Sequence, residues 1–71
     1  GPDAAAPLLD ALGDDPRLAG SHRLALARAD VARRAGRDDV AATRYREALT
    51  LGGTGPERRL VRARLRDLGE S

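Results

Sequence analysis

Very few side chains in this sequence could carry out chemistry, and His22 and Tyr45 are the first to consider. The 71 residues include one histidine and no cysteine. A zinc site needs three or four protein ligands, so His22 alone cannot supply one. No nucleophile accompanies it in a pattern typical of covalent catalysis. We therefore expect no catalytic, metal-binding or cofactor-binding residue and no enzyme activity. The expected role of His22 is a partly exposed position at a helix start, and that of Tyr45 is packing between helices, with its hydroxyl at the edge.

The arginines near the end of the sequence form its most concentrated charge. Arg58, Arg62 and Arg66 recur at i, i+4 and i+8, which places them on one face of a helix. A basic helix face can bind phosphate, but there is no aromatic residue beside it for base stacking, and neighbouring acidic residues offset part of the charge. The pattern favours a solvated terminal face, and a docking site for an acidic protein surface is the alternative.

A second candidate surface lies between residues 21 and 35. Its members are spaced by three and four residues and share one face of a helix: Arg23, Leu26, Asp30, Arg33 and Arg34. Such a face binds an extended segment or another helix through charge pairing. The alternative is an ordinary charged surface on which Asp30 pairs internally with Arg33 or Arg34. The candidate partner-binding residues are therefore these five together with Arg58, Arg62 and Arg66.

The elements that position these residues are predicted to be helices. Hydrophobic residues make up 41% of the sequence and consist of 14 Ala, 11 Leu, 3 Val and Tyr45. Ala and Leu are the strongest helix formers, whereas the β-branched and aromatic residues typical of strands are nearly missing. A chain of 71 residues forms at most one small domain and buries too little surface for a deep substrate pocket. The expected class is all-α.

The net charge and the hydropathy of the sequence restrict the classes of partner that we expect for it. The net charge of +2 is the small difference between 13 basic and 11 acidic residues, so no contiguous positive field is expected and no direct nucleic-acid binding. No apolar run approaches the ~20 residues that span a bilayer, and no signal-peptide pattern is present. We expect a cytoplasmic location without membrane contact.

Apolar periodicity and capping residues predict four helices, near 3–12, 21–35, 38–51 and 56–68. Ser21 is expected to cap the second helix, and Asp38 or Asp39 the third. Thr54 and Glu57 have the spacing of a capping box at the start of the fourth. Because the connection between the second and third helices is only about three residues long, these two should form an antiparallel hairpin.

Three prolines lie within the first 20 residues and affect where helices can form there. Pro7 removes one backbone donor, which is harmless in the first turn of a helix but produces a kink if the helix begins earlier. Asp15-Pro16 predicts a short turn that Gly20 ends. Gly1-Pro2 has two interpretations that both stay open, a native segment or the remnant of a cleaved affinity tag.

The predicted hairpin resembles a tetratricopeptide repeat (TPR). The resemblance rests on the spacing of a glycine, three alanines and an aromatic residue: Ala29, Gly36, Ala41, Tyr45 and Ala48. In such repeats the small residues lie where two antiparallel helices cross closely, and the aromatic residue fills the gap toward the next helix. The sequence departs from the repeat pattern in three places: Ala25 stands for Trp, Arg28 for Leu and Gly53 for Pro.

A more specific resemblance extends over residues 8–68. It rests on the segments Leu8-Leu9-Asp10-Ala11-Leu12, Asp15-Pro16-Arg17-Leu18-Ala19-Gly20, His22-Arg23-Leu24, Arg28-Ala29-Asp30, Arg33-Arg34-Ala35-Gly36-Arg37 and Pro56-Glu57-Arg58-Arg59. In these the sequence resembles the C-terminal TPR-like extension of actinobacterial extracytoplasmic-function (ECF) RNA polymerase sigma factors. The position of Gly1-Pro2 also matches the end of that family's Asp-Gly-Pro motif, while Ala6-Pro7 departs from its pattern.

The resemblance implies a small four-helix TPR-like array that regulates transcription initiation by protein contact. Its implied partners are the sigma core domains, RNA polymerase or a regulatory protein, and the chain would be one part of a longer protein. A generic TPR-type peptide-binding or scaffold fragment is the first alternative. A small basic nucleic-acid-binding domain is the second.

The first helix is expected to leave an apolar patch uncovered. Leu8, Leu9 and Leu12 precede the hairpin, and a repeat unit needs neighbours on both sides to cover its hydrophobic faces. We expect an exposed leucine patch that promotes self-association through this helix.

Overall fold

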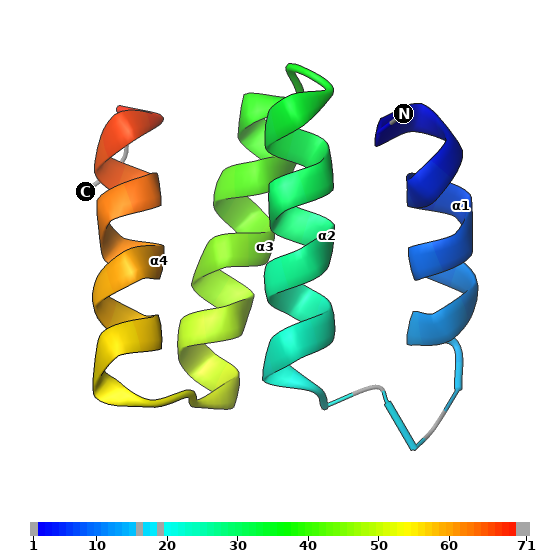
Figure 1. Ribbon diagram of the computed structural model, residues 1–71, viewed down its shortest axis with the longest axis horizontal. Coiled ribbons are helices and arrows are strands. Elements are labelled where there is room, and N and C mark those ends of the chain that lie inside the picture. Colours follow the sequence, from blue (N-terminus) through cyan, green and yellow to red (C-terminus); the bar gives the residue numbers. More distant parts are fainter. Residues whose placement is uncertain (1, 16, 19, 70–71) are drawn as a thin grey trace.

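The computed structural model describes residues 2–15, 17–18 and 20–69, and for residues 2–6 and 13 it describes the backbone alone. These residues form an all-α domain with four helices: α1 (Pro2–Gly13), α2 (His22–Arg34), α3 (Asp38–Leu51) and α4 (Gly55–Asp67). The helices lie side by side in chain order, and each runs antiparallel to the one before it (Figure 1). The predicted class, the antiparallel pairing of α2 with α3 and the helix bounds, to within one residue, are confirmed.

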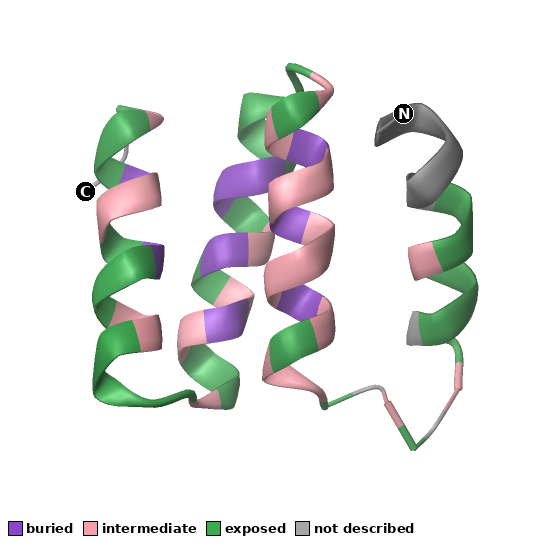
Figure 2. Ribbon diagram, viewed as in Figure 1, coloured by how far each residue is buried: buried purple, intermediate pink, exposed green. Residues whose placement is uncertain are grey.

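The core is built mainly from alanine. Nine hydrophobic side chains are buried among the described residues: Ala25, Ala29, Ala32, Ala41, Ala42, Tyr45, Ala48, Val61 and Leu65. Six of these nine are alanine, which lets neighbouring helices approach closely. All nine lie on α2, α3 and α4 (Figure 2), whereas the described side chains of α1 are exposed or half-buried. The core therefore sits around α3, and α1 is an outer element.

The caps explain where the helices begin and end. The Ser21 hydroxyl accepts a hydrogen bond from the Leu24 backbone N–H at 3.2 Å, as predicted for α2. The capping box of α4 is also confirmed, with Glu57 N–H donating to Thr54 Oγ1 at 3.2 Å and Thr54 N–H to Glu57 Oε1 at 3.1 Å. These interactions are local in sequence, which is why their spacing predicts them.

The predicted cap of α3 is wrong. Neither Asp38 nor Asp39 is the N-cap; Arg37 holds that position without a side-chain hydrogen bond. The cause is the ending of α2, where Gly36 adopts a φ of 77° and the Arg37 N–H donates back to the Ala32 carbonyl at 2.9 Å. The chain re-enters a helix directly after this turn, so both aspartates fall in the first turn of α3, where the helix dipole favours negative charge.

The predictions for the prolines and for the connection between α1 and α2 are confirmed only in part. Because α1 begins at Pro2, Pro7 lies inside the helix rather than in its first turn, and the helix continues through it. The predicted turn after α1 is present, with the Leu18 N–H donating to the Asp15 carbonyl at 2.9 Å. Gly1 and Pro16, which also figured in the predictions, lie outside the described residues.

Candidate partner-binding surfaces

A polar network on the candidate face of α2 is anchored by a core residue of α3. The Tyr45 ring is fully buried, while its hydroxyl donates to Asp30 Oδ1 and accepts a hydrogen bond from Arg33 Nε at 3.2 Å. Arg33 and Asp30 also form an internal pair, as expected from the alternative interpretation of this face, with 4.0 Å between Nη2 and Oδ1. Burial, followed by the Asp30 hydrogen bond, raises the pKa of the Tyr45 hydroxyl. Tyr45 therefore remains a protonated donor and holds this pair in a fixed position.

The eight predicted residues are distributed over α2 and α4, which run in the same direction beside α3 (Figure 1). These helices approach each other at their beginnings, where His22 Nε2 lies 3.5 Å from Glu57 Oε2. The pKa of Arg33 on α2 is raised, first by its hydrogen bond with Tyr45 and in smaller part by the carboxylates of Asp30 and Asp67. We call the predicted set the α2/α4 surface: Arg23, Leu26, Asp30, Arg33, Arg34, Arg58, Arg62 and Arg66.

The members of the α2/α4 surface differ in accessibility. Its exposed members are all arginines: Arg23, Arg34, Arg62 and Arg66. Leu26, Asp30 and Arg33 are half-buried. The structure thus exposes four guanidinium groups, two on α2 and two on α4, and both helices contribute to the core.

Arg58 has a structural task that the sequence pattern did not reveal. Its Nη1 donates to the Leu49 carbonyl at 2.6 Å and to the Gly52 carbonyl at 3.2 Å. These oxygens belong to the end of α3, where carbonyl groups have no partner within the helix. Arg58 therefore ties the start of α4 to the end of α3, and its four-residue spacing with Arg62 and Arg66 does not make the three equivalent.

His22 is also more deeply placed than expected. Its side chain is only 11% exposed, with Nδ1 2.8 Å from the Ala48 carbonyl and Nε2 facing Glu57. Gly53 leaves room for the ring, since a Cβ at that position would come within 2.6 Å of it. The pKa of Glu57 is lowered, mainly by its two hydrogen bonds with Thr54 and in smaller part by His22 and Arg23. His22 therefore joins α2, α3 and α4 at one end of the domain.

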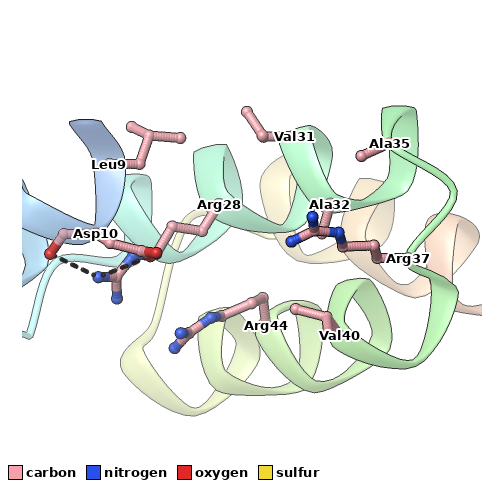
Figure 3. A pocket seen from close by; sticks show the side chains of 9 residues that line it. All are labelled: Leu9, Asp10, Arg28, Val31, Ala32, Ala35, Arg37, Val40 and Arg44. Carbon is pink, nitrogen blue, oxygen red and sulfur yellow. Dashed lines mark hydrogen bonds and ion pairs between the residues drawn. The ribbon is translucent and has the colours of Figure 1, made fainter. Parts of the chain in front are cut away.

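A cavity in the described part of the domain lies away from the α2/α4 surface. It has a volume of about 110 Å³ and opens between α1, α2 and α3 (Figure 3). It is lined by Leu9, Asp10, Arg28, Val31, Ala32, Ala35, Arg37, Val40 and Arg44. None of these residues is among the eight predicted ones. Helical spacing groups residues of one helix, whereas the cavity is formed by residues from three helices.

The described residues contain neither a metal-binding cluster nor a membrane-spanning helix. Within them, no three His, Cys, Asp or Glu side chains are grouped closely enough to hold a metal ion. None of the helices in the described part of the chain has the length and apolar character needed to cross a membrane.

Comparisons with protein-family models, with curated proteins and with solved structures found no match for this chain.

Proposed function

We propose that this chain is a non-catalytic protein-interaction module, the TPR-like regulatory region of an ECF sigma factor, and that its α2/α4 surface docks on the sigma core, on RNA polymerase or on a regulatory protein. The family part of this proposal is supported by the sequence resemblance over residues 8–68. The docking part is carried by one observation: α2 and α4, which also contribute to the core, expose four arginines.

Docking would regulate transcription by a shift in population. A module of this kind changes the fraction of active holoenzyme only if its contacts differ between the active and inactive states. The exposed guanidinium groups fit an acidic protein surface, with which arginine forms bidentate pairs. Rim charges of this type contribute to orientation and association rate more than to affinity. The partner is therefore expected to present carboxylates at the spacing of one helix turn.

The first experiment asks whether the gene encodes the two core sigma domains upstream of residue 1, as the proposal requires. Those domains are then purified separately and titrated with the 71-residue chain by isothermal titration calorimetry. The double variant Arg34→Glu/Arg62→Glu should bind about 10-fold or more weakly, because it places two carboxylates against an acidic surface. Arg17→Glu is the matched control, since Arg17 is 88% exposed and lies on the connection between α1 and α2. Equal affinities for all three proteins would contradict the proposal.

The alternative of a small basic nucleic-acid binder is favoured only by the arginines of α4. Binding to random duplex DNA is measured by fluorescence anisotropy at two salt concentrations. A phosphate binder that makes several contacts loses roughly 10³-fold or more in affinity between about 50 and 200 mM salt. Salt-sensitive binding of this size would favour the alternative, and no binding is the result expected for a docking module.

A further inference from the structure

The cavity between α1, α2 and α3 combines an apolar lining with a basic rim. Its apolar residues come from all three helices and the end of α2: Leu9 from α1, Val31 and Ala32 from α2, Ala35 at the C-cap of α2, and Val40 from α3. The charged residues at its edge are Asp10, Arg28, Arg37 and Arg44. Asp10 pairs with Arg28 and Glu47 pairs with Arg44, so the excess positive charge at the cavity is that of Arg37.

The carboxylate of Asp10 at the cavity edge already pairs with Arg28. Arg28 Nη2 donates to the Asp10 carbonyl at 3.3 Å and lies 3.5 Å from its carboxylate, which attaches α1 to α2. Arg28 Nε is buried and has no hydrogen-bond partner among the described residues. Buried polar groups are almost always paired, so this donor is available to an acceptor that enters beside it.

The other two arginines differ in their partners. Arg44 pairs with Glu47 on its own helix at 3.1 Å. The Arg37 guanidinium makes no hydrogen bond or ion pair within the described part of the chain, and Figure 3 shows it extending from the start of α3 over the apolar lining toward Ala32. Arg37 is exposed, so its guanidinium is free to pair with an anionic group on whatever fills the cavity.

The volume limits what can enter. An apolar cavity of about 150 Å³ holds a benzene molecule, so the 110 Å³ found here suits one branched aliphatic side chain. A fatty acyl chain is too long to be enclosed. A bare phosphate would satisfy the arginines but leave the apolar lining uncovered.

We propose that this cavity binds an acidic segment of a partner protein, with one leucine or valine side chain in the cavity and flanking carboxylates paired with Arg37 and Arg44. This site lies on the opposite face of α2 from the α2/α4 surface and goes beyond the function proposed above. The two sites share no residue, so either can fail in experiment without the other.

The test is a titration of the ¹⁵N-labelled chain with the peptide acetyl-Glu-Asp-Leu-Glu-Asp-amide, followed by NMR. With one aliphatic anchor and two exposed ion pairs, the expected dissociation constant is about 1 mM. The backbone signals that shift should be those of Val31, Ala35, Arg37 and Val40. Signals of α4 should stay unchanged. Replacing the peptide's leucine by alanine, or its acidic residues by their amides, should weaken binding about 10-fold each.

Variants of the chain test the two halves of the site separately. Arg37→Gln removes the unpartnered charge and should weaken binding about 10-fold, whereas Arg59→Gln, the same change at an exposed position of α4, should not. Ala35→Leu places a side chain in the cavity and should abolish peptide binding while the thermal midpoint is retained or rises.

Several results would overturn the proposal. They are the absence of shifts at about 10 mM peptide, shifts that persist in Ala35→Leu or Arg37→Gln, and binding of inorganic phosphate or octanoate as tight as that of the peptide. The same shifts appearing without peptide, as the protein concentration rises, would identify a second copy of the chain as the occupant instead.

Discussion

Tyr45 shows how one side chain links the core to the candidate docking surface. Its ring is enclosed by α2, α3 and α4, while its hydroxyl organises Asp30 and Arg33 at the surface. The burial of Tyr45 and the pairing of Asp30 with Arg33 follow from helical spacing and were predicted. The capture of this pair by the hydroxyl was not, because it depends on how α2 and α3 are rotated against each other.

We expect Tyr45→Phe to lower the free energy of unfolding by about 1 kcal/mol, because a donor to a half-exposed carboxylate is lost while the ring remains. Urea denaturation measures the change. Asp30→Ala should cost a similar amount, and the double variant should cost less than the sum of the two, since both remove one hydrogen bond. Strict additivity would show that the hydroxyl and the carboxylate do not stabilise each other.

Helix ends were predictable where their caps are local and unpredictable where they are tertiary. The Thr54 and Glu57 capping box spans three residues and was recognised from the sequence. The interactions of Arg58 with the end of α3 and of His22 with the Ala48 carbonyl span nine and 26 residues, so no spacing rule reveals them. The first arises because α4 folds back along α3 after the Gly52-Gly53 turn, and the second because α2 and α3 pack as an antiparallel pair.

We expect the Arg58 side chain to stabilise the fold by joining α4 to the end of α3. Arg58→Met retains the aliphatic stem but leaves carbonyls at the end of α3 without a donor, and should lower stability by about 1–2 kcal/mol. Arg62→Met, one helical turn further along α4 and exposed, is the control and should change stability by less than about 0.5 kcal/mol. Thermal unfolding followed by circular dichroism compares the two. Equal effects would assign Arg58 to the solvated face instead.

The α4 capping box should make stability depend on acid. The folded-state pKa of Glu57 lies below its ordinary value of 4.5, chiefly because its carboxylate accepts the Thr54 backbone hydrogen bond. The unfolded chain therefore takes up this proton more readily, so the contribution of Glu57 is present above its ordinary pKa and is lost as pH falls through the folded pKa. Between about pH 5 and pH 3, Glu57→Gln should lose less of its thermal midpoint than the parent protein. An equal fall of the thermal midpoint in the two proteins as the pH is lowered would argue against this role.

The two outer helices of the molecule differ in what they bury, although each exposes leucine. On α1, Leu8 is 65% exposed and Leu12 41%; on α4, Leu60 is 45% exposed, whereas Val61 and Leu65 are buried against the core. The sequence predicted an uncovered patch of Leu8, Leu9 and Leu12; Leu8 and Leu12 are exposed, whereas Leu9 is half-buried and lines the cavity. The cavity beside α1 was not, because it forms where three helices fail to fill the space between them.

The exposed leucines should promote self-association of the 71-residue chain. We expect sedimentation velocity to show a weight-average mass that rises with protein concentration toward that of a dimer. Leu8→Glu should keep the protein monomeric without lowering its thermal midpoint, since this side chain contributes little to the core. A strictly monomeric parent protein at about 1 mM would contradict the prediction.

The central claim is that α2 and α4 together form the protein-docking surface. The most direct measurement is a cross-saturation NMR experiment on the labelled chain bound to the sigma core domains named above. The account predicts signal loss at Arg23, Arg34, Arg62 and Arg66, and none along α1. Signal loss confined to α1, or no loss at all at saturating core domains, would contradict it.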